Sequence, residues 1–212
     1  MAGPEASSLL LEFTRRMATS GLSPGRSGNL SLRTENGLLI TPSALDYGDM
    51  CEEDMVELQL DGNKQSGDRR PSSEWRFHAA IYANFPGANA VVHCHSRFAT
   101  TLACLGRSIP AFHYMVAMAG GNSIPCAPYA TFGTQDLADL AIEAMADRKA
   151  CLLGNHGQLA WHTSIERAYE LAVEVESLSA MYFHALQLDQ PNILDEDEMR
   201  RVVDKFQDYR SS

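Results

Sequence analysis

Residues 90–95 read AVVHCH, an apolar run rich in valine that predicts a buried β-strand ending in two histidines. Side chains alternate between the two faces of a strand, so His93 and His95 point to one face and Cys94 to the other. Two imidazoles one pleat apart can bind a single transition-metal ion. Ordinary hydrogen-bonded histidines have the same spacing, and the pair alone does not decide between the two roles.

The composition indicates a globular protein and excludes several classes. A chain of 212 residues can bury a substantial core, and we predict that residues 1–212 form a single domain. The net charge of −10 argues against a nucleic-acid-binding surface. The first twenty residues lack the apolar core of a signal peptide or membrane span, so we expect no membrane association. Five scattered cysteines without a CxxC pair favour reduced thiols and a cytoplasmic location.

The pattern of apolar residues predicts an α/β protein. We expect helices over Ser7–Ser20, Ser73–Asn84, Arg97–Leu105, Thr134–Lys149, Ser164–Leu188 and Asp195–Gln207. We expect strands over Gly28–Arg33, Leu38–Thr41, Met55–Leu60, Ala90–His95, Ala150–Gly154 and Gln158–Trp161, with an irregular region from Pro110 to Gly133. Strands joined by hairpins, with helices before, between and after them, predict a three-layer α/β/α sandwich with a mainly antiparallel central sheet.

His156 is the best candidate for a third metal ligand. It lies in the tight turn NHG at residues 155–157, between two predicted strands, where a side chain can project from the rim of the sheet. Three neutral imidazoles that leave one position open are typical of a catalytic zinc site. Taken by itself, His156 is more often a hydrogen-bonded surface or core histidine.

Glu74 is a candidate for a catalytic carboxylate, with His78 as a complication. The motif PSSE at residues 71–74 places Glu74 in the first turn of a predicted helix, where Ser72 or Ser73 can act as the N-cap. Most glutamates at this position only cap helices. His78 follows four residues later on the same helix face, so Glu74 and His78 form a rival metal-binding pair that spacing cannot reject.

Short loops rich in small residues are candidates for phosphate binding. GRSGN at residues 25–29, TPS at 41–43 and the Ser72–Ser73 pair can expose backbone N–H groups and hydroxyls. Each alone is more often a simple turn. Arg26 adds a charge suited to a phosphate dianion.

With these residues identified, the chain resembles the class II, zinc-dependent aldolase family, and most closely its L-fuculose-1-phosphate aldolase branch. The matching motifs occur in the family order and cover almost the whole chain: Ser27–Ser31, Leu39–Ser43, Pro71–His78, Ala90–His95, Ile109–Met115, Gly120–Thr134, Asn155–Gly157 and Lys205–Tyr209. The resemblance implies the fold of class II aldolases and adducin head domains. It also implies Zn²⁺ on His93, His95 and His156 with Glu74 beside it, and leaves His78 off the metal. A homotetramer with active sites at subunit interfaces is implied too.

The activity implied by the resemblance is reversible cleavage of a ketose 1-phosphate to dihydroxyacetone phosphate and an aldehyde. Zn²⁺ would stabilise the charge left on the ketone fragment, and Glu74 would act as the base. Tyr114 would protonate the aldehyde oxygen, and Tyr209 would close over the site. Phe132 would line the substrate pocket. The residues expected to bind the phosphate are Arg26, Gly28, Asn29, Ser43, Ala44, Ser72 and Ser73.

Several departures from the family pattern leave the substrate open. Arg26 and Ser27 replace a Thr-Ala pair in the phosphate loop, and Ala44 replaces a glycine. L-fuculose 1-phosphate, a deoxy-pentulose 1-phosphate and methylthioribulose 1-phosphate all remain candidates.

Three related functions compete with the aldolase interpretation. An L-ribulose-5-phosphate 4-epimerase would have Asp in place of Glu74 and lack the segment from Phe112 to Tyr114. A methylthioribulose-1-phosphate dehydratase would use zinc and Glu in a related arrangement. A metal-free adducin-like interaction module would have lost zinc ligands, whereas this chain retains the three histidines and Glu74.

Overall fold

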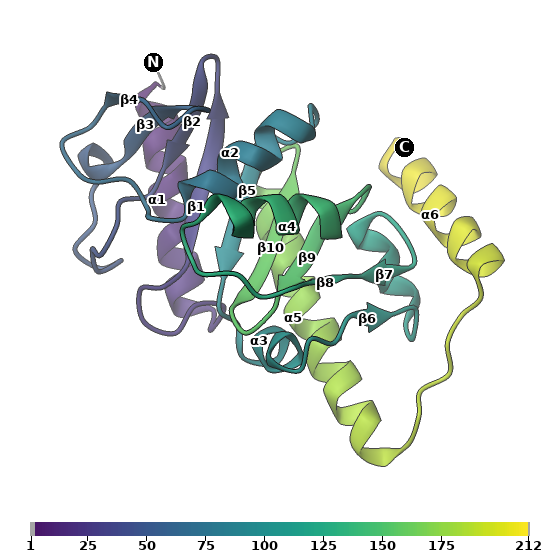
Figure 1. Cartoon of the computed structure of the whole chain (residues 1–212). Helices are drawn as coiled ribbons and strands as arrows, with labels where there is room; N and C mark the ends of the chain where they lie inside the picture. The colour runs from purple at the N-terminus through teal and green to yellow at the C-terminus, as the bar shows by residue number, and fades with distance from the viewer. Residues whose placement is uncertain (1–2, 212) are drawn as a thin grey trace.

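A central eight-stranded sheet organises the molecule (Figure 1). The computed structural model describes the backbone of residues 3–211 and the side chains of residues 3–206. The strand order is β4-β3-β2-β1-β5-β10-β9-β8, and the pairings are antiparallel except that of β8 with β9. The strands of this sheet are β1 (Asn29–Thr34), β2 (Gly37–Ile40), β3 (Val56–Gln59), β4 (Lys64–Ser66), β5 (Ala90–Cys94), β8 (Cys126–Ala127), β9 (Ala150–Leu153) and β10 (Gly157–His162).

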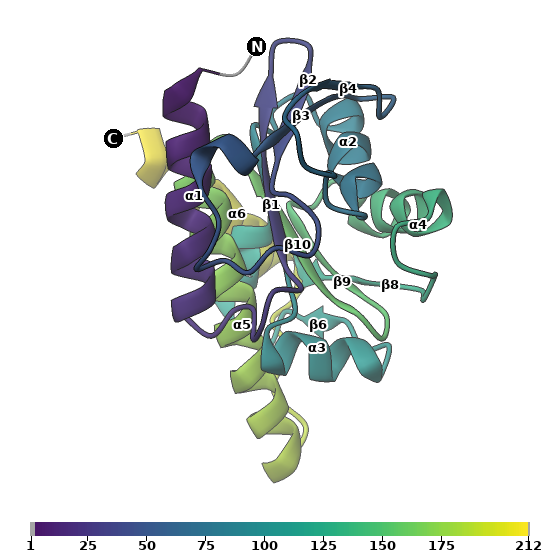
Figure 2. The ribbon, with the colours of Figure 1, turned by 90° about the vertical axis from the view of Figure 1, so that its left-hand side faces the viewer.

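Helices cover both faces of this sheet. In Figure 2, α1 and α5 lie on one side of it and α2 and α4 on the other. The α-helices are α1 (Pro4–Thr19), α2 (Trp75–Asn84), α3 (Arg97–Cys104), α4 (Gln135–Met145), α5 (Ile165–Leu188) and α6 (Glu196–Ser211). The remaining elements are the 3-10 helices η1 (Glu52–Asp54) and η2 (Tyr114–Ala119) and a small sheet of β6 (Ile109–Pro110) and β7 (Ser123–Ile124). The predicted three-layer sandwich with a mainly antiparallel sheet is therefore confirmed.

Alternation along β1 and β5 separates two cores. Leu30, Val92 and Cys94 belong to the core shared with α1 and α5, whereas Val91 belongs to the core shared with α2 and α4. Asn29 pairs with His93 across the two strands, on the α2 side. The predicted orientation of His93 away from Cys94 is therefore confirmed.

One strand was missed and one local prediction was wrong. The polar stretch that forms β4 has no apolar alternation, and it joins the sheet edge by backbone pairing with β3. Helix α2 begins at Trp75, and Glu74 is its N-cap residue without a side-chain cap. Ser72 instead closes a turn before the helix, because its hydroxyl accepts from the Glu74 N–H and its carbonyl accepts from the Trp75 N–H.

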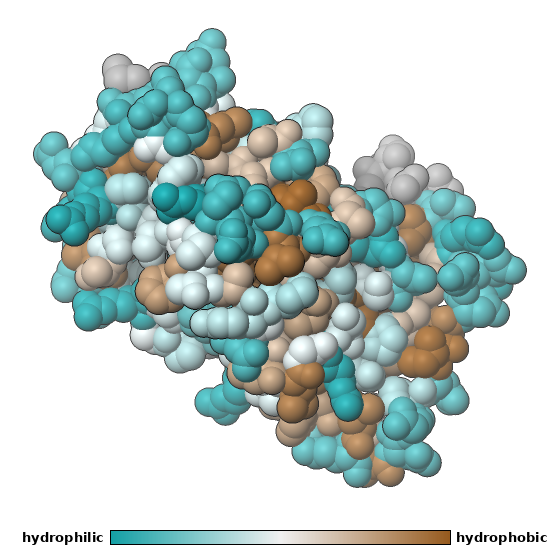
Figure 3. Space-filling view, viewed as in Figure 1, coloured by the Kyte–Doolittle hydropathy of each residue, from teal (hydrophilic) through white to brown (hydrophobic). Residues whose placement is uncertain are grey.

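The surface view in Figure 3 shows polar residues over most of one face, interrupted by separate hydrophobic patches. Exposed large apolar side chains include Leu105, Tyr114, Tyr129, Phe132 and Leu188. Among the described residues, none of the helices is both long enough and apolar enough to cross a bilayer.

Candidate active site

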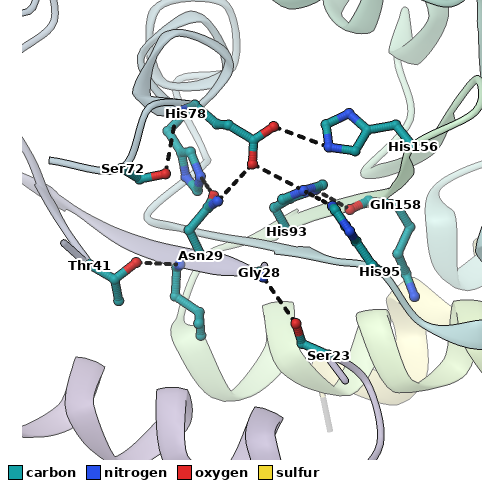
Figure 4. A network of polar contacts seen from close by, with 12 residues as sticks. Ser23, Gly28, Asn29, Thr41, Ser72, His78, His93, His95, His156 and Gln158 are labelled. Atoms are coloured by element: carbon teal, nitrogen blue, oxygen red, sulfur yellow. Dashed lines mark hydrogen bonds and ion pairs between the residues drawn. The ribbon is translucent and has the colours of Figure 1, made fainter. Parts of the chain in front are cut away.

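Four side chains from three parts of the chain meet beside the sheet (Figure 4). Glu74 precedes α2 and His156 lies in the β9–β10 turn. His93 lies near the end of β5, and His95 directly follows this strand. Their ligand atoms all lie within 4.8 Å of one another. The Nε2 atoms of His93 and His95 are 3.0 Å apart, and the Glu74 carboxylate lies 3.3 Å from His93 Nε2 and 3.1 Å from His156 Nε2.

The geometry of this cluster fits a metal ion. The three imidazole rings have centroids 4.8–4.9 Å apart and planes inclined by 68–78°, so their edges converge. Tetrahedral ligands at a Zn–N distance of about 2.0–2.1 Å are themselves about 3.3 Å apart. His93 Nδ1–H donates to the Gln158 carbonyl at 2.9 Å, which leaves its Nε2 lone pair facing the cluster. Glu74 Oε1 is buried and faces the cluster, with His156 Nε2 3.1 Å away.

Burial and mutual charge set the protonation states expected here. Burial and the neighbouring His93 and His156 together lower the pKa of His95 to about 3, so the His95 ring is neutral. Burial alone would raise the pKa of Glu74. The attraction of His93 and His156 outweighs that effect and holds the Glu74 pKa well below its ordinary value. The cluster thus presents an anionic carboxylate among imidazoles.

Close backbone packing positions His156. A Cβ atom at Gly157 would lie 2.5 Å from the Cys94 carbonyl oxygen and 2.9 Å from His95 Cδ2. Only glycine therefore lets the β9–β10 turn approach β5 closely enough for His156 to join the other ligands. Asn155, at φ 53°, provides the left-handed residue of the turn, a conformation that asparagine tolerates well.

His78, the rival ligand, is directed away from the cluster. It is fully buried, with Nε2 2.6 Å from Asn29 Oδ1 and Nδ1 2.7 Å from Ser31 Oγ. Burial lowers the pKa of His78 to about 3, so the ring is neutral. Both ring nitrogens already have protein partners, and the Glu74–His78 metal pair that spacing left open is not formed.

A cavity of about 370 Å³ opens beside the cluster. Its walls contain Glu74, His95 and His156 together with every residue predicted to bind phosphate and the predicted pocket residue: Arg26, Gly28, Asn29, Ser43, Ala44, Ser72, Ser73 and Phe132. The sequence interpretation missed Tyr129 and Asn155 as wall residues. In the sequence Asn155 shows only as part of a turn, and Tyr129 lies in the region expected to be irregular. The cavity therefore joins the candidate metal ligands to three separate small-residue loops.

Comparison with known proteins identifies the family. Residues 8–183 match the family described as Class II Aldolase and Adducin N-terminal domain. The chain is 52% identical over 200 residues to a 5-methylthioribulose-1-phosphate/5-deoxyribulose-1-phosphate aldolase of Rhodospirillum rubrum, covering 94% of this chain and 90% of the relative. It is 45% identical to the L-fuculose phosphate aldolase of Escherichia coli K12, covering 94% and 93%. A solved L-fuculose 1-phosphate aldolase superimposes with a TM-score of 0.95 at 37% identity, covering 98% of each chain.

The chain belongs to the class II aldolase family. Its relatives over nearly the full length are aldolases, so this chain is an aldolase and hence a lyase. The family and the cluster of three histidines with Glu74 together indicate a metal-dependent enzyme.

Two departures of this class II aldolase from the family pattern, Arg26 and Ala44, have structural consequences in the loops that line the cavity. Arg26 is exposed at the cavity wall, and its guanidinium donates to the Ala44 carbonyl at 3.4 Å. Ala44 adopts φ 61°, a left-handed conformation in which glycine is unstrained and alanine is not. Ala44 therefore has a backbone conformation that favours glycine.

Tyr114, the predicted acid, lies outside this cavity. Tyr114 begins η2, is half exposed, and packs against Phe206 of α6 with ring centroids 6.3 Å apart. It lines a different cavity, between η2 and α6. Tyr209 belongs to α6, but its side chain lies outside the described part of the structure. Within one chain, the structure brings Glu74 and the histidines together and leaves Tyr114 apart from them.

Proposed function

We propose that this class II aldolase uses Zn²⁺ to cleave a ketose 1-phosphate reversibly into dihydroxyacetone phosphate and an aldehyde. The observation that carries the proposal is the joining of the cluster Glu74/His93/His95/His156 to a cavity lined by phosphate-sized, amide-rich loops. A phosphate held at Gly28, Ser43 and Ser72 would direct the carbonyl end of the substrate toward the histidines. Bound to them, Zn²⁺ would supply positive charge where negative charge develops on oxygen.

In this proposal Glu74 moves the proton on carbon. In the synthetic direction it would take a proton from the carbon next to the carbonyl of dihydroxyacetone phosphate, and in cleavage it would return that proton. Its pKa lies below the ordinary value, which keeps it anionic and able to accept. The Asn29 amide donates to Glu74 Oε2 at 2.9 Å and holds the carboxylate at the cavity wall.

The second proton transfer is assigned to Tyr114 of a neighbouring subunit. As the bond between the two carbon fragments forms, the aldehyde oxygen would take the phenolic proton, and in cleavage the reverse transfer would occur. The separation of Tyr114 from the cavity of its own chain supports a homotetramer with active sites at interfaces. Tyr209 of α6 would close over the same site, and Phe132 would contact the substrate.

We further propose a deoxy-pentulose or methylthioribulose 1-phosphate as the first substrates to test, ahead of L-fuculose 1-phosphate. The Rhodospirillum rubrum relative, at 52% identity, bears the name of an aldolase for such substrates.

We also propose that residues 1–212 act as one domain in the cytoplasm. The absence of any disulfide among the cysteines, all within the described residues, agrees with a reducing location.

A coupled assay tests the proposal. Purified protein is incubated with each ketose 1-phosphate, and released dihydroxyacetone phosphate is measured through NADH oxidation by glycerol-phosphate dehydrogenase. We expect cleavage that a chelator abolishes and Zn²⁺ restores, with the 5-deoxy or 5-methylthio substrate showing the highest kcat/KM. Absence of cleavage by zinc-loaded protein on all of these substrates would contradict the reaction, and cleavage that survives complete metal removal would contradict the metal's role.

A further inference from the structure

A buried chain of hydrogen bonds leads away from Glu74 into the protein (Figure 4). Asn29 Nδ2 lies 2.9 Å from Glu74 Oε2, and Asn29 Oδ1 lies 2.6 Å from His78 Nε2. Ser31 Oγ then lies 2.7 Å from His78 Nδ1 and 2.7 Å from the Tyr82 hydroxyl. All five side chains are at most 5% exposed. Burying polar groups this deeply costs folding free energy unless each one is hydrogen-bonded. The bonds between these five side chains therefore stabilise their arrangement.

The anionic Glu74 at one end of this series of hydrogen bonds determines which group donates and which accepts in each bond. Glu74 can only accept, so Asn29 must present its NH₂ group there and its oxygen to His78. His78 must then carry its proton on Nε2 and accept from Ser31 at Nδ1, and Ser31 accepts from the Tyr82 hydroxyl. In the opposite arrangement the Asn29 oxygen would face a carboxylate at 2.9 Å, which is repulsive.

We propose that His78 is a positioning residue, whose Nε2–H holds the Asn29 amide in the one orientation that donates to Glu74. The inference rests on the proposed function of Glu74 as the base and assigns to His78 a role that the metal cluster does not use. Without His78, Glu74 alone would oppose a flipped amide, and the buried Asn29 oxygen would lose its donor. His78 holds the amide from its other side and so keeps Glu74 at the cavity wall.

The placement of His78 favours this role over simple filling of space. It stacks on Phe77 with ring centroids 4.9 Å apart, so an aromatic hydrocarbon would fill the same volume. A hydrophobic side chain would be cheaper at a fully buried site. The imidazole is needed only because it joins a donor and an acceptor on opposite sides of one ring.

Imidazole NMR tests the tautomer without any activity measurement. With ¹⁵N-histidine labelling of the whole protein, we expect His78 in the zinc-loaded and metal-free forms to show a protonated Nε2 and a bare Nδ1. The Nε2–H should exchange slowly with solvent because His78 is fully buried. A His78 tautomer protonated at Nδ1 would overturn the proposal even if the enzyme is fully active.

Three substitutions test the consequence for turnover. His78→Gln can place an NH₂ group near the position of Nε2, whereas His78→Asn reaches only toward Ser31 and His78→Phe removes both bonds. We expect His78→Phe and His78→Asn to lower kcat roughly tenfold, equivalent to about 1.4 kcal/mol, with smaller changes in KM. His78→Gln should recover most of the loss, and all three should retain metal at one ion per chain.

A matched control separates positioning from folding. Ser31→Ala removes the hydroxyl that donates to His78 Nδ1. Ser179→Ala removes an equally buried hydroxyl that donates to the Val175 carbonyl. We expect Ser31→Ala to lower kcat and Ser179→Ala to leave it unchanged at equal thermal stability. Wild-type kinetics in a folded His78→Phe variant, or an equal loss in Gln and Phe variants, would contradict the proposal. Inactivity of the wild-type enzyme would instead contradict the proposed function, and the NMR result would still stand.

Discussion

The Glu74–histidine end of the molecule and the Tyr114–α6 end differ in how completely one chain builds them. At the first end, the Glu74 carboxylate lies 3.3 Å from His93 Nε2 and 3.1 Å from His156 Nε2, beside a cavity of about 370 Å³. At the second end, Tyr114 is half exposed and contacts Phe206 in a separate cavity. In our proposal, metal and phosphate binding therefore need a single chain, whereas the second proton transfer needs a neighbour.

Removal of a metal ligand tests the Glu74–histidine end and should have the largest effect. His93→Ala or His95→Ala leaves the remaining ligands too few to hold the ion, so we expect loss of bound metal and a fall in kcat of about 10³-fold or more. Metal analysis and the coupled cleavage assay measure both. His184→Ala, an exposed histidine of α5, is the control and should retain metal and activity. Full activity in a metal-free His95→Ala protein would contradict the assignment.

Glu74→Gln separates the base from the metal site. The amide keeps the size of the side chain but cannot accept the proton, so we expect kcat to fall by about 10²- to 10⁴-fold. The three histidines still hold the ion, so metal content should stay near one per chain. A variant that turns over at the wild-type rate with metal bound would remove Glu74 as the base.

Tyr114→Phe tests the Tyr114–α6 end. We expect kcat to fall by about 10- to 100-fold with metal content unchanged, because water replaces a phenol as acid more readily than it replaces the base. The sharper experiment mixes unfolded Tyr114→Phe and Glu74→Gln chains and refolds them together. A site at an interface then regains activity in mixed oligomers, since some sites combine intact Glu74 and Tyr114. No recovery in oligomers shown to be mixed would place both residues in one chain.

Ala44→Gly probes the phosphate loop and should have the smallest effect. A left-handed alanine costs about 1–2 kcal/mol. Added glycine entropy in the unfolded chain offsets about 0.4–1 kcal/mol of that. We therefore expect the free energy of unfolding to rise by roughly 0.5 kcal/mol in urea titrations. Ala146→Gly, at φ 48° and remote from the cavity, is the matched control. A lower KM in Ala44→Gly alone would show that alanine perturbs phosphate binding, and a loss of stability would contradict the strain argument.

The fold and much of the site follow from local patterns in the sequence. Strand alternation predicts that His93 and His95 share a face, and the NHG turn predicts that His156 projects from the rim of the sheet. Both features depend on residues close together in the chain. β4 was missed because its polar residues pair through the backbone, which leaves no apolar pattern to read.

The parts that sequence reasoning left open depend on contacts between distant residues. Spacing could not choose between His78 and the other histidines as Glu74's partner. The choice depends on Asn29 and Ser31, which lie 49 and 47 residues away from His78. The position of Tyr114 relative to the cavity depends on the packing of η2 against α6 and, in our proposal, on a second chain.

Hydrogen exchange on carbon tests the central claim most directly. Metal-loaded protein is incubated with dihydroxyacetone phosphate in D₂O without any aldehyde. Proton NMR follows the two hydrogens on the hydroxymethyl carbon next to the carbonyl. We predict replacement of one of those hydrogens by deuterium, and loss of that exchange in Glu74→Gln and after chelation. No exchange with wild-type, metal-loaded protein, or undiminished exchange with Glu74→Gln, would contradict Glu74 as the base at a metal-dependent site.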